Sequence, residues 1–260
     1  MRQGFTTVVL YHPARPLRCL LGVLARLNNV TKLYHKVELF IQGAGPAIHI
    51  PPSSQFTFDL QVIRKKENTG VAVPLAESIS RLDTTYWGKI DDDIFLPPSA
   101  WDLLLECIRL SEKEFNTKAA FISPGKMSPI LFRLDRNILK MQDGSLKECV
   151  HAGKTWHICD YTGLGATIVL KEVFDSGITV DRNYFVAGEN LDFCWQMKRN
   201  NFRFVHMTKP MCEHRQKGCQ SAAYNAIRWD RKVIEKSALY FQKKWGLKNP
   251  QLWKACNLGL

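Results

Sequence analysis

Three consecutive carboxylates, Asp91, Asp92 and Asp93, follow a short apolar stretch. The run Tyr86-Trp-Gly-Lys-Ile90 predicts a buried strand, and a Pro-Pro turn after the carboxylates precedes a new helix. Like charges this close repel one another, and burying an unpaired carboxylate costs free energy, so the cluster calls for a cation. Oxygen ligands suit Mg²⁺ or Mn²⁺, which also hold the phosphates of a substrate. We therefore predict a divalent-metal site here, in preference to a solvated acidic turn.

A layered α/β architecture is expected to position this cluster. Strands are predicted at 5–11, 36–41, 60–64, 86–90 and 119–122. Helices are predicted at 17–27 and 71–82 and from Ser99, where Ser99 and Asp102 resemble a capping box. This alternation predicts a largely parallel sheet with helices on both faces. Ligands of such sheets bind beyond the carboxyl ends of the strands, where the acidic cluster lies.

The second half of the chain is divided less evenly. Residues 123–160 show little periodicity and predict an inserted, partly irregular segment over one edge of the site. The remaining strands are expected at 163–170 and 203–206, the remaining helices at 171–176 and 186–199, and a basic amphipathic helix or helix pair at 221–246. We therefore predict a catalytic domain over residues 1–220 and a helical extension packed on it over residues 221–260.

Composition indicates an anionic partner and a reducing environment. The net charge of +12 suits nucleotides, phospholipid or polyprenyl-phosphate surfaces, or nucleic acid. Eight cysteines without a C-x-x-C pair indicate reduced thiols. No apolar run approaches the ~20 residues of a membrane span, and the N-terminus lacks the apolar core of a signal peptide. A cytoplasmic protein is expected, with peripheral membrane contact through the basic tail.

Several segments, in order over residues 5–246, resemble the family 2 glycosyltransferases with the GT-A fold. They include the strand Thr7–Tyr11, the turn Glu67-Asn-Thr-Gly70, Asp91–Asp93 as the DxD motif, the acidic motif Gly188-Glu-Asn-Leu-Asp192, and the basic tail Tyr224–Gly246. The resemblance implies a GT-A α/β fold. It also implies metal-dependent transfer of a sugar from a nucleotide-diphosphate sugar to a hydroxyl of a glycan, a lipid-linked or a protein-linked acceptor.

The same resemblance assigns candidate binding residues. The implied donor-binding residues are Tyr11, Asn68, Asp91, Asp92 and Arg215. The implied ligands of Mn²⁺ or Mg²⁺ are Asp93, Asp91 and His214. His214 also reads as an ordinary loop histidine. Arg215 would balance charge on the departing diphosphate.

The catalytic motif departs from the family. Inverting members have Glu-Asp, the Asp being the general base, whereas this chain has Glu189-Asn190, and an amide cannot accept that proton. Glu189 and Asp192 are three apart at a helix start and can share one cleft, so either is a candidate base for an inverting reaction. Gly-Glu-Asn also resembles retaining transferases that glycosylate polypeptides and need no such base. Asp192 alternatively stabilises the fold.

Aromatic residues and rival functions complete the predictions. Trp156 and Tyr161 are candidates for stacking on an acceptor sugar, while Trp87 and Trp195 suit the core. Asn190 leaves open a catalytically impaired protein that only binds a sugar nucleotide. A nucleic-acid binder would explain the charge, but no recognised motif supports it, and nucleic acid is not expected as a partner. A nucleotidyltransferase would be expected to have a Gly-rich loop after the first strand, which is missing.

Overall fold

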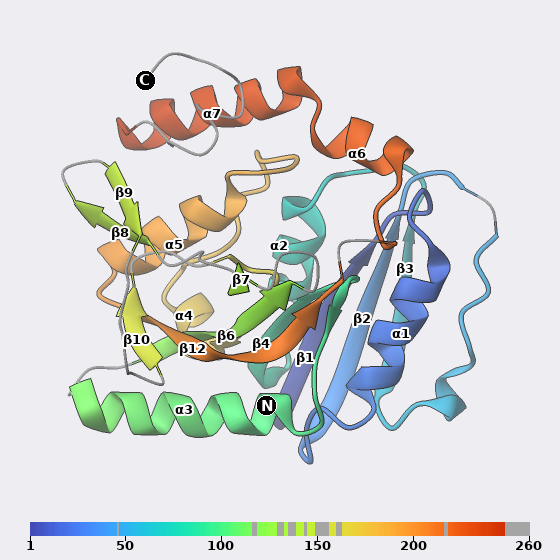
Figure 1. Cartoon of the computed structure of the whole chain (residues 1–260), viewed down its shortest axis with the longest axis horizontal. Coiled ribbons are helices and arrows are strands. Elements are labelled where there is room, and N and C mark those ends of the chain that lie inside the picture. The colour runs from blue at the N-terminus through green and yellow to red at the C-terminus, as the bar shows by residue number, and fades with distance from the viewer. Residues whose placement is uncertain are drawn as a thin grey trace.

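The computed structural model describes the backbone of most of the chain (Figure 1). The described residues are 1–45, 47–115, 119–128, 133–134, 139–142, 145–148, 156–159, 163–215 and 218–247. Within them, the side chains of residues 114–162 and 207–211 lie outside the description. The site and its supporting elements fall in the described part.

One mixed sheet organises the described chain. Its main strands are β1 (Arg2–Tyr11), β2 (Tyr34–Gln42), β3 (Asp59–Lys65), β4 (Thr84–Asp91), β6 (Ala119–Ser128), β10 (Trp156–Cys159), β11 (Ala166–Leu170) and β12 (Arg203–His214). Their order is β10-β12-β6-β11-β4-β1-β2-β3. Strands β3, β2, β1 and β4 run parallel, β6 and β12 are parallel to each other, and β11 joins the two groups antiparallel. The predicted, mainly parallel α/β fold is confirmed.

Helices cover both faces of this sheet. They are α1 (Leu17–Leu27), α2 (Ala72–Ser80), α3 (Ala100–Phe115), α4 (Lys171–Asp175), α5 (Glu189–Arg199), α6 (Ala222–Arg228) and α7 (Arg231–Trp245), with a short 3-10 turn at Ser53–Gln55. Because side chains alternate along a strand, Val9 packs with α1 and α3, while Val8 packs with α2, α5 and α7. Trp87 is fully buried in the second of these cores, as predicted.

The sequence predictions up to residue 115 match the observed elements closely, with one correction. The strand and helix bounds agree to within about three residues at each end, as is usual for such assignments. The capping box is wrong, because Asp102 accepts hydrogen bonds from Thr31 Oγ1 at 2.5 Å and from the Lys32 backbone N–H at 3.0 Å. Asp102 therefore ties α3 to the loop before β2.

The segment 123–160 contains several short strands. Strand β6 continues to Ser128, and β7 (Arg133–Leu134), β8 (Leu139–Gln142), β9 (Ser145–Glu148) and β10 follow it. Strands β8 and β9 pair with each other in a separate two-stranded sheet. Backbone pairing supplies these stretches with a regularity that side-chain periodicity does not reveal, and the partly irregular insert over the site stays a prediction.

The basic tail forms a helix pair. Ser221 caps α6 by accepting from the Tyr224 N–H at 3.1 Å, and Asp230 caps α7 by accepting from the N–H groups of Lys232 and Val233. Phe241 anchors α7 in the core, and α6 and α7 border the molecule on the side opposite α3 (Figure 1). Among the described residues, none of the helices has the length and apolar character needed to span a bilayer.

Candidate functional site

The acidic cluster lies where strand β4 ends. Asp91 is the last residue of β4, and its side chain is partly exposed and pairs with Lys89. Asp92 and Asp93 are buried, at 1% and 2% exposure. The short strand β5 (Ile94–Phe95) follows at once and pairs with the end of β12. This pairing places His214, the last residue of β12, beside the acidic cluster.

Arg15 supplies the positive charge that the buried carboxylates require. Its guanidinium pairs with Asp92, and its Nη2 lies 2.8 Å from Asp93 Oδ2. Burial raises the pKa of Asp92 to about 8, against the attraction of Arg15. Burial also acts to raise the pKa of Asp93, but the hydrogen bond with His214 and the charge of Arg15 outweigh it and hold that pKa well below its usual range. Asp93 is therefore ionised in the folded protein.

His214 and Asp93 form the part of the site best suited to a metal. His214 Nε2 lies 3.4 Å from Asp93 Oδ1, and the structure gives no hydrogen-bond partner within the described chain to Asp92 Oδ2. A carboxylate oxygen and an imidazole nitrogen are ligands that Mn²⁺ accepts. Among the described side chains, no ready-made group of three or more such ligands is gathered. The residues thus fit a metal whose remaining ligands come from a substrate.

A pocket opens at the carboxyl ends of β1 and β2. It is lined by Leu10, His12, Gln42, Asn68, Gly70, Val71, Phe185, Val186, Tyr224, Ile227 and Arg228. Helix α6 closes one side, where the Tyr224 ring lies 5.8 Å from the His12 ring. The structure therefore places Asn68 in this pocket. It does not place Tyr11 there: Tyr11 is buried, and its hydroxyl donates to the Arg15 carbonyl at 2.6 Å.

The turn at Asn68 is built by side-chain contacts. Asn68 Oδ1 accepts from the Gly70 N–H at 3.0 Å, and Gln42 Nε2 donates to the Gly70 carbonyl at 2.7 Å. Gly70 has φ of +77°, and a Cβ there would stand 2.1 Å from the Phe185 carbonyl oxygen. Only glycine suits this close approach. The turn consequently packs on the segment that leads to α5.

Glu189 opens helix α5 after a strained turn. Ala187 and Gly188 both have positive φ, +65° and +96°, and this conformation is costly for alanine. Glu189 is buried, and within the described chain its Oε2 has no hydrogen-bond partner. Burial raises the pKa of its carboxyl, against the attraction of Lys89 and Arg228. Since Arg228 lines the pocket and Lys89 pairs with Asp91, Glu189 belongs electrostatically to the same site.

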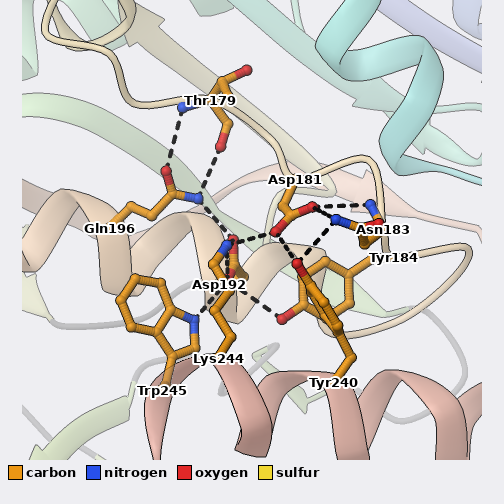
Figure 2. A network of polar contacts seen from close by, with 9 residues as sticks. All are labelled: Thr179, Asp181, Asn183, Tyr184, Asp192, Gln196, Tyr240, Lys244 and Trp245. Atoms are coloured by element: carbon orange, nitrogen blue, oxygen red, sulfur yellow. Dashed lines mark hydrogen bonds and ion pairs between the residues drawn. The ribbon is translucent and has the colours of Figure 1, made fainter.

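Asp192 belongs to a different environment. Its Oδ1 accepts from Trp245 Nε1 at 2.6 Å and lies 3.3 Å from the Tyr184 hydroxyl, and its Oδ2 accepts from Gln196 Nε2 at 2.7 Å (Figure 2). Lys244 Nζ adds an ion pair at 2.8 Å and also binds Asp181 at 2.7 Å. Both oxygens of Asp192 thus face α7 and its neighbours. These contacts favour the second interpretation of the sequence, a carboxylate that stabilises the fold.

The other predicted site residues lie at the periphery or outside the description. Arg215 bonds Asp93 only through its backbone N–H, at 2.8 Å, while its guanidinium pairs with Glu213 and lies over the Phe95 ring. The backbone of Trp156 opens β10, but its side chain lies outside the description, as does all of Tyr161. The prediction that these two residues bind an acceptor stays a prediction.

A disulfide lies next to the acidic cluster. Cys19 on α1 is bonded to Cys219, with their Cα atoms 5.7 Å apart. Arg15 Nε donates to the Cys219 carbonyl at 2.9 Å, and Ser221 Oγ donates to the Ala14 carbonyl at 2.5 Å. The prediction of reduced thiols is wrong for this pair, because the two cysteines meet only in the folded chain. The cytoplasmic location predicted with it stays a prediction.

Sequence reasoning missed Arg15 and Lys89, the two cations of the acidic cluster. Lys89 and Asp91 are two residues apart on β4 and so lie on the same face of the strand, and a lysine two residues before the acidic cluster was the available signal. Arg15 lies in the loop after β1, and only the parallel pairing of β1 with β4 brings it to Asp92 and Asp93. No sequence spacing indicates that contact.

Comparison with known proteins identifies the fold. The sequence matches no known family model and none of the curated proteins. The structure resembles the crystal structure of S. aureus TarS 1-349, with a TM-score of 0.59 and 11% identity over 98% of this chain and 69% of that one. The same TarS fragment in complex with UDP-GlcNAc gives a TM-score of 0.61 and 11% identity over 98% and 70%. The chain therefore has the GT-A-like fold of these TarS structures, as predicted.

Proposed function

We propose that this protein is a glycosyltransferase that moves a sugar from a nucleotide-diphosphate sugar to an acceptor hydroxyl, with a divalent cation held at Asp93 and His214. The observation that supports it most directly is the meeting of these two side chains at 3.4 Å beside the end of β4. They come from distant parts of the chain, and Asp93 is buried, at 2% exposure. The TarS fragments that this fold resembles bind UDP-GlcNAc and UDP.

The donor would lie across the carboxyl ends of the strands, as ligands of such sheets do. The pocket between Asn68 and Tyr224 would take the nucleoside, and the diphosphate would extend from it toward Asp91 and Asp93. Asp91 is the most exposed of the three carboxylates, which suits contact with the ribose. Lys89 and Arg228 would face the negative charge of the diphosphate. When bound, the metal would neutralise the departing diphosphate.

Glu189 is the proposed general base. Its buried carboxylate has an oxygen without a described partner and lies within the electrostatic reach of Asp91, Lys89 and Arg228. As the acceptor oxygen bonds to the anomeric carbon, the bond from that carbon to the phosphate oxygen breaks, and Glu189 takes the hydroxyl proton. The nucleoside diphosphate leaves with the bonding electrons. Single displacement of this kind inverts the anomeric centre.

Donor binding and release of the nucleoside diphosphate test this function. We would titrate UDP-, GDP- and dTDP-sugars by calorimetry with Mn²⁺ or EDTA, and follow slow hydrolysis of the donor. Loss of metal-dependent donor binding and hydrolysis in Asp93→Ala and in His214→Gln supports the proposal. The control is Asp175→Ala, on the exposed side of α4. His214 is the safer variant, because Asp93 also pairs with Arg15. Failure of every sugar nucleotide to bind, with or without metal, would overturn it.

A second candidate is a protein that binds the donor without turnover. The specific observation is Asn190, an amide where related transferases have the base, next to an Asp192 whose oxygens are engaged by α7. Metal-dependent donor binding without release of nucleotide would favour this function. Appearance of turnover in Asn190→Asp would then show that the missing carboxylate was the cause.

A further inference from the structure

The outer face of α7 carries three exposed lysines and an exposed leucine, none of which packs in the core. At about 100° per residue, Lys232, Lys236, Leu239 and Lys243 lie within about 60° of one another around the helix axis. All four are exposed, while Ile234, Ser237, Ala238 and Phe241 of the opposite face are buried. The basic stripe is defined as these four residues together with the exposed Trp229, which immediately precedes the N-cap of α7.

The lysines of the basic stripe form no ion pairs with the described part of the protein. Within the described chain, no carboxylate forms an ion pair with Lys232, Lys236 or Lys243. Lys244, one residue further, is the contrast, because it pairs with Asp181 and Asp192 and holds α7 in place. Three unpaired ammonium groups along about three turns of helix create a positive surface that attracts anions.

Two large apolar side chains interrupt this positive surface. Trp229 is 56% exposed and lies beside the Arg228 guanidinium, and Leu239 is 51% exposed and lies one helical turn from Lys236 and Lys243. Water is a poor environment for them, whereas tryptophan and leucine next to lysine suit the boundary between lipid headgroups and acyl chains. A polyphosphate or a nucleic-acid backbone would use the lysines but not the leucine. The mixture therefore favours a lipid surface over a soluble polyanion.

We infer that the basic stripe docks the protein on an anionic membrane surface. The lysines lie among the headgroups, and Trp229 and Leu239 enter the interface. Helices α6 and α7 form one border of the molecule, so a flat surface can reach the stripe without meeting α3 on the opposite border (Figure 1). No membrane-spanning helix is needed for such a contact.

The location of the stripe connects it with the site. Arg228 lines the pocket at the ends of β1 and β2, and its guanidinium lies 5.2 Å from the ring centroid of Trp229. The Trp229 end of the basic stripe therefore lies beside a residue that lines the pocket. If the proposed function holds, this position suits an acceptor linked to a lipid. The docking itself rests on α7 and does not depend on that function.

Vesicle binding tests the inference without a turnover assay. We would measure flotation of the whole protein with vesicles of phosphatidylcholine alone and with vesicles that also contain about 30 mol% phosphatidylglycerol, which makes the surface strongly negative. Binding is expected only to the anionic vesicles and is expected to weaken steeply with salt. The triple variant Lys232→Gln, Lys236→Gln, Lys243→Gln is expected to lose roughly a hundredfold in apparent affinity, about fivefold per lysine.

The apolar part of the stripe has its own test. Leu239→Ser and Trp229→Ala are each expected to weaken binding to anionic vesicles severalfold at low salt, and Leu239→Ser is expected to leave donor affinity and thermal stability unchanged. The matched control is Leu103→Ser, an exposed leucine on α3 whose neighbours carry both signs of charge. Equal binding to neutral vesicles, or unchanged affinity in the triple variant, would overturn the inference. So would tighter, tryptophan-independent binding of single-stranded RNA, which would identify a soluble polyanion site.

Discussion

Trp245 donates its indole N–H to Asp192 Oδ1 at 2.6 Å, and this bond joins the last turn of α7 to the first turn of α5. Glu189, the proposed base, occupies the same first turn of α5. The C-terminal helix therefore holds in place the helix that presents Glu189 to the site. Under the proposed function, Asp192 would therefore act only by positioning α5, whereas Glu189 would face the reacting groups.

Replacing Asp192 with asparagine is expected to destabilise the protein. The change leaves Lys244 without one of its two carboxylate partners and gives Trp245 and Gln196 a neutral acceptor. Breaking a buried pair of this kind costs about 3 kcal/mol of unfolding free energy. Urea denaturation measures the loss, and Asp175→Asn, an exposed partner of Lys171, is the control and should stay within about 0.5 kcal/mol of the wild type. A fully stable Asp192→Asn protein without turnover would instead make Asp192 the base.

Glu189→Gln, unlike Asp192→Asn, is expected to lower turnover without destabilising the protein. Turnover should fall by about a hundredfold or more, because the amide cannot accept the hydroxyl proton, while donor affinity changes little. Burial raises the pKa of Glu189, so the folded state binds an extra proton between the ordinary value of 4.5 and the raised value. Stability from this carboxyl is thus lost as pH rises through the raised pKa. At neutral pH the glutamine variant should be at least as stable as the wild type.

The pH dependence of turnover checks the same assignment. A base works only when ionised, so the rate should rise with pH as Glu189 loses its proton, with a midpoint above 4.5. The rise should vanish in Glu189→Gln and persist in Asp192→Asn. A rise of unchanged midpoint in Glu189→Gln would assign the titration to another group.

The sequence predicts the fold well because strand and helix patterning is local. Helix α1 has the predicted bounds, and the acidic residues at the end of β4 follow from hydrophobic alternation and the parallel-sheet rule. Asp93 was predicted within a metal site from the chemistry of the acidic cluster, and His214 only through resemblance to a family; the structure brings the two side chains together. The contacts of Arg15, the Cys19–Cys219 bond and the burial of Asp192 depend on long-range packing. Local pattern contains no information on which strands will be neighbours.

Reduction of the disulfide is expected to weaken both the fold and the donor site. The bond closes a loop of 200 residues, and loops of that length contribute about 5 kcal/mol in the chain-entropy description. Reduction also frees Cys219, whose carbonyl accepts from Arg15 next to Asp92 and Asp93. We expect dithiothreitol to lower the thermal midpoint and to weaken donor binding severalfold. The double variant Cys19→Ser, Cys219→Ser should show both defects and no further response to dithiothreitol, and peptide mapping without reductant that recovers the two cysteines unlinked would contradict the prediction.

His35 is expected to make the protein acid-sensitive. It is buried in β2, with Nε2 2.9 Å from Thr7 Oγ1, and burial lowers its pKa from 6.5 to about 4. Between these values the unfolded chain binds a proton that the folded protein does not, so stability present above pH 6.5 is lost as pH falls toward 4. At about 1.4 kcal/mol per pKa unit the loss is about 3 kcal/mol. Urea denaturation at several pH values should show a shallower acid dependence in His35→Gln than in the wild type, and the exposed control His49→Gln should keep the full dependence. Identical slopes for all three proteins would place the acid sensitivity elsewhere.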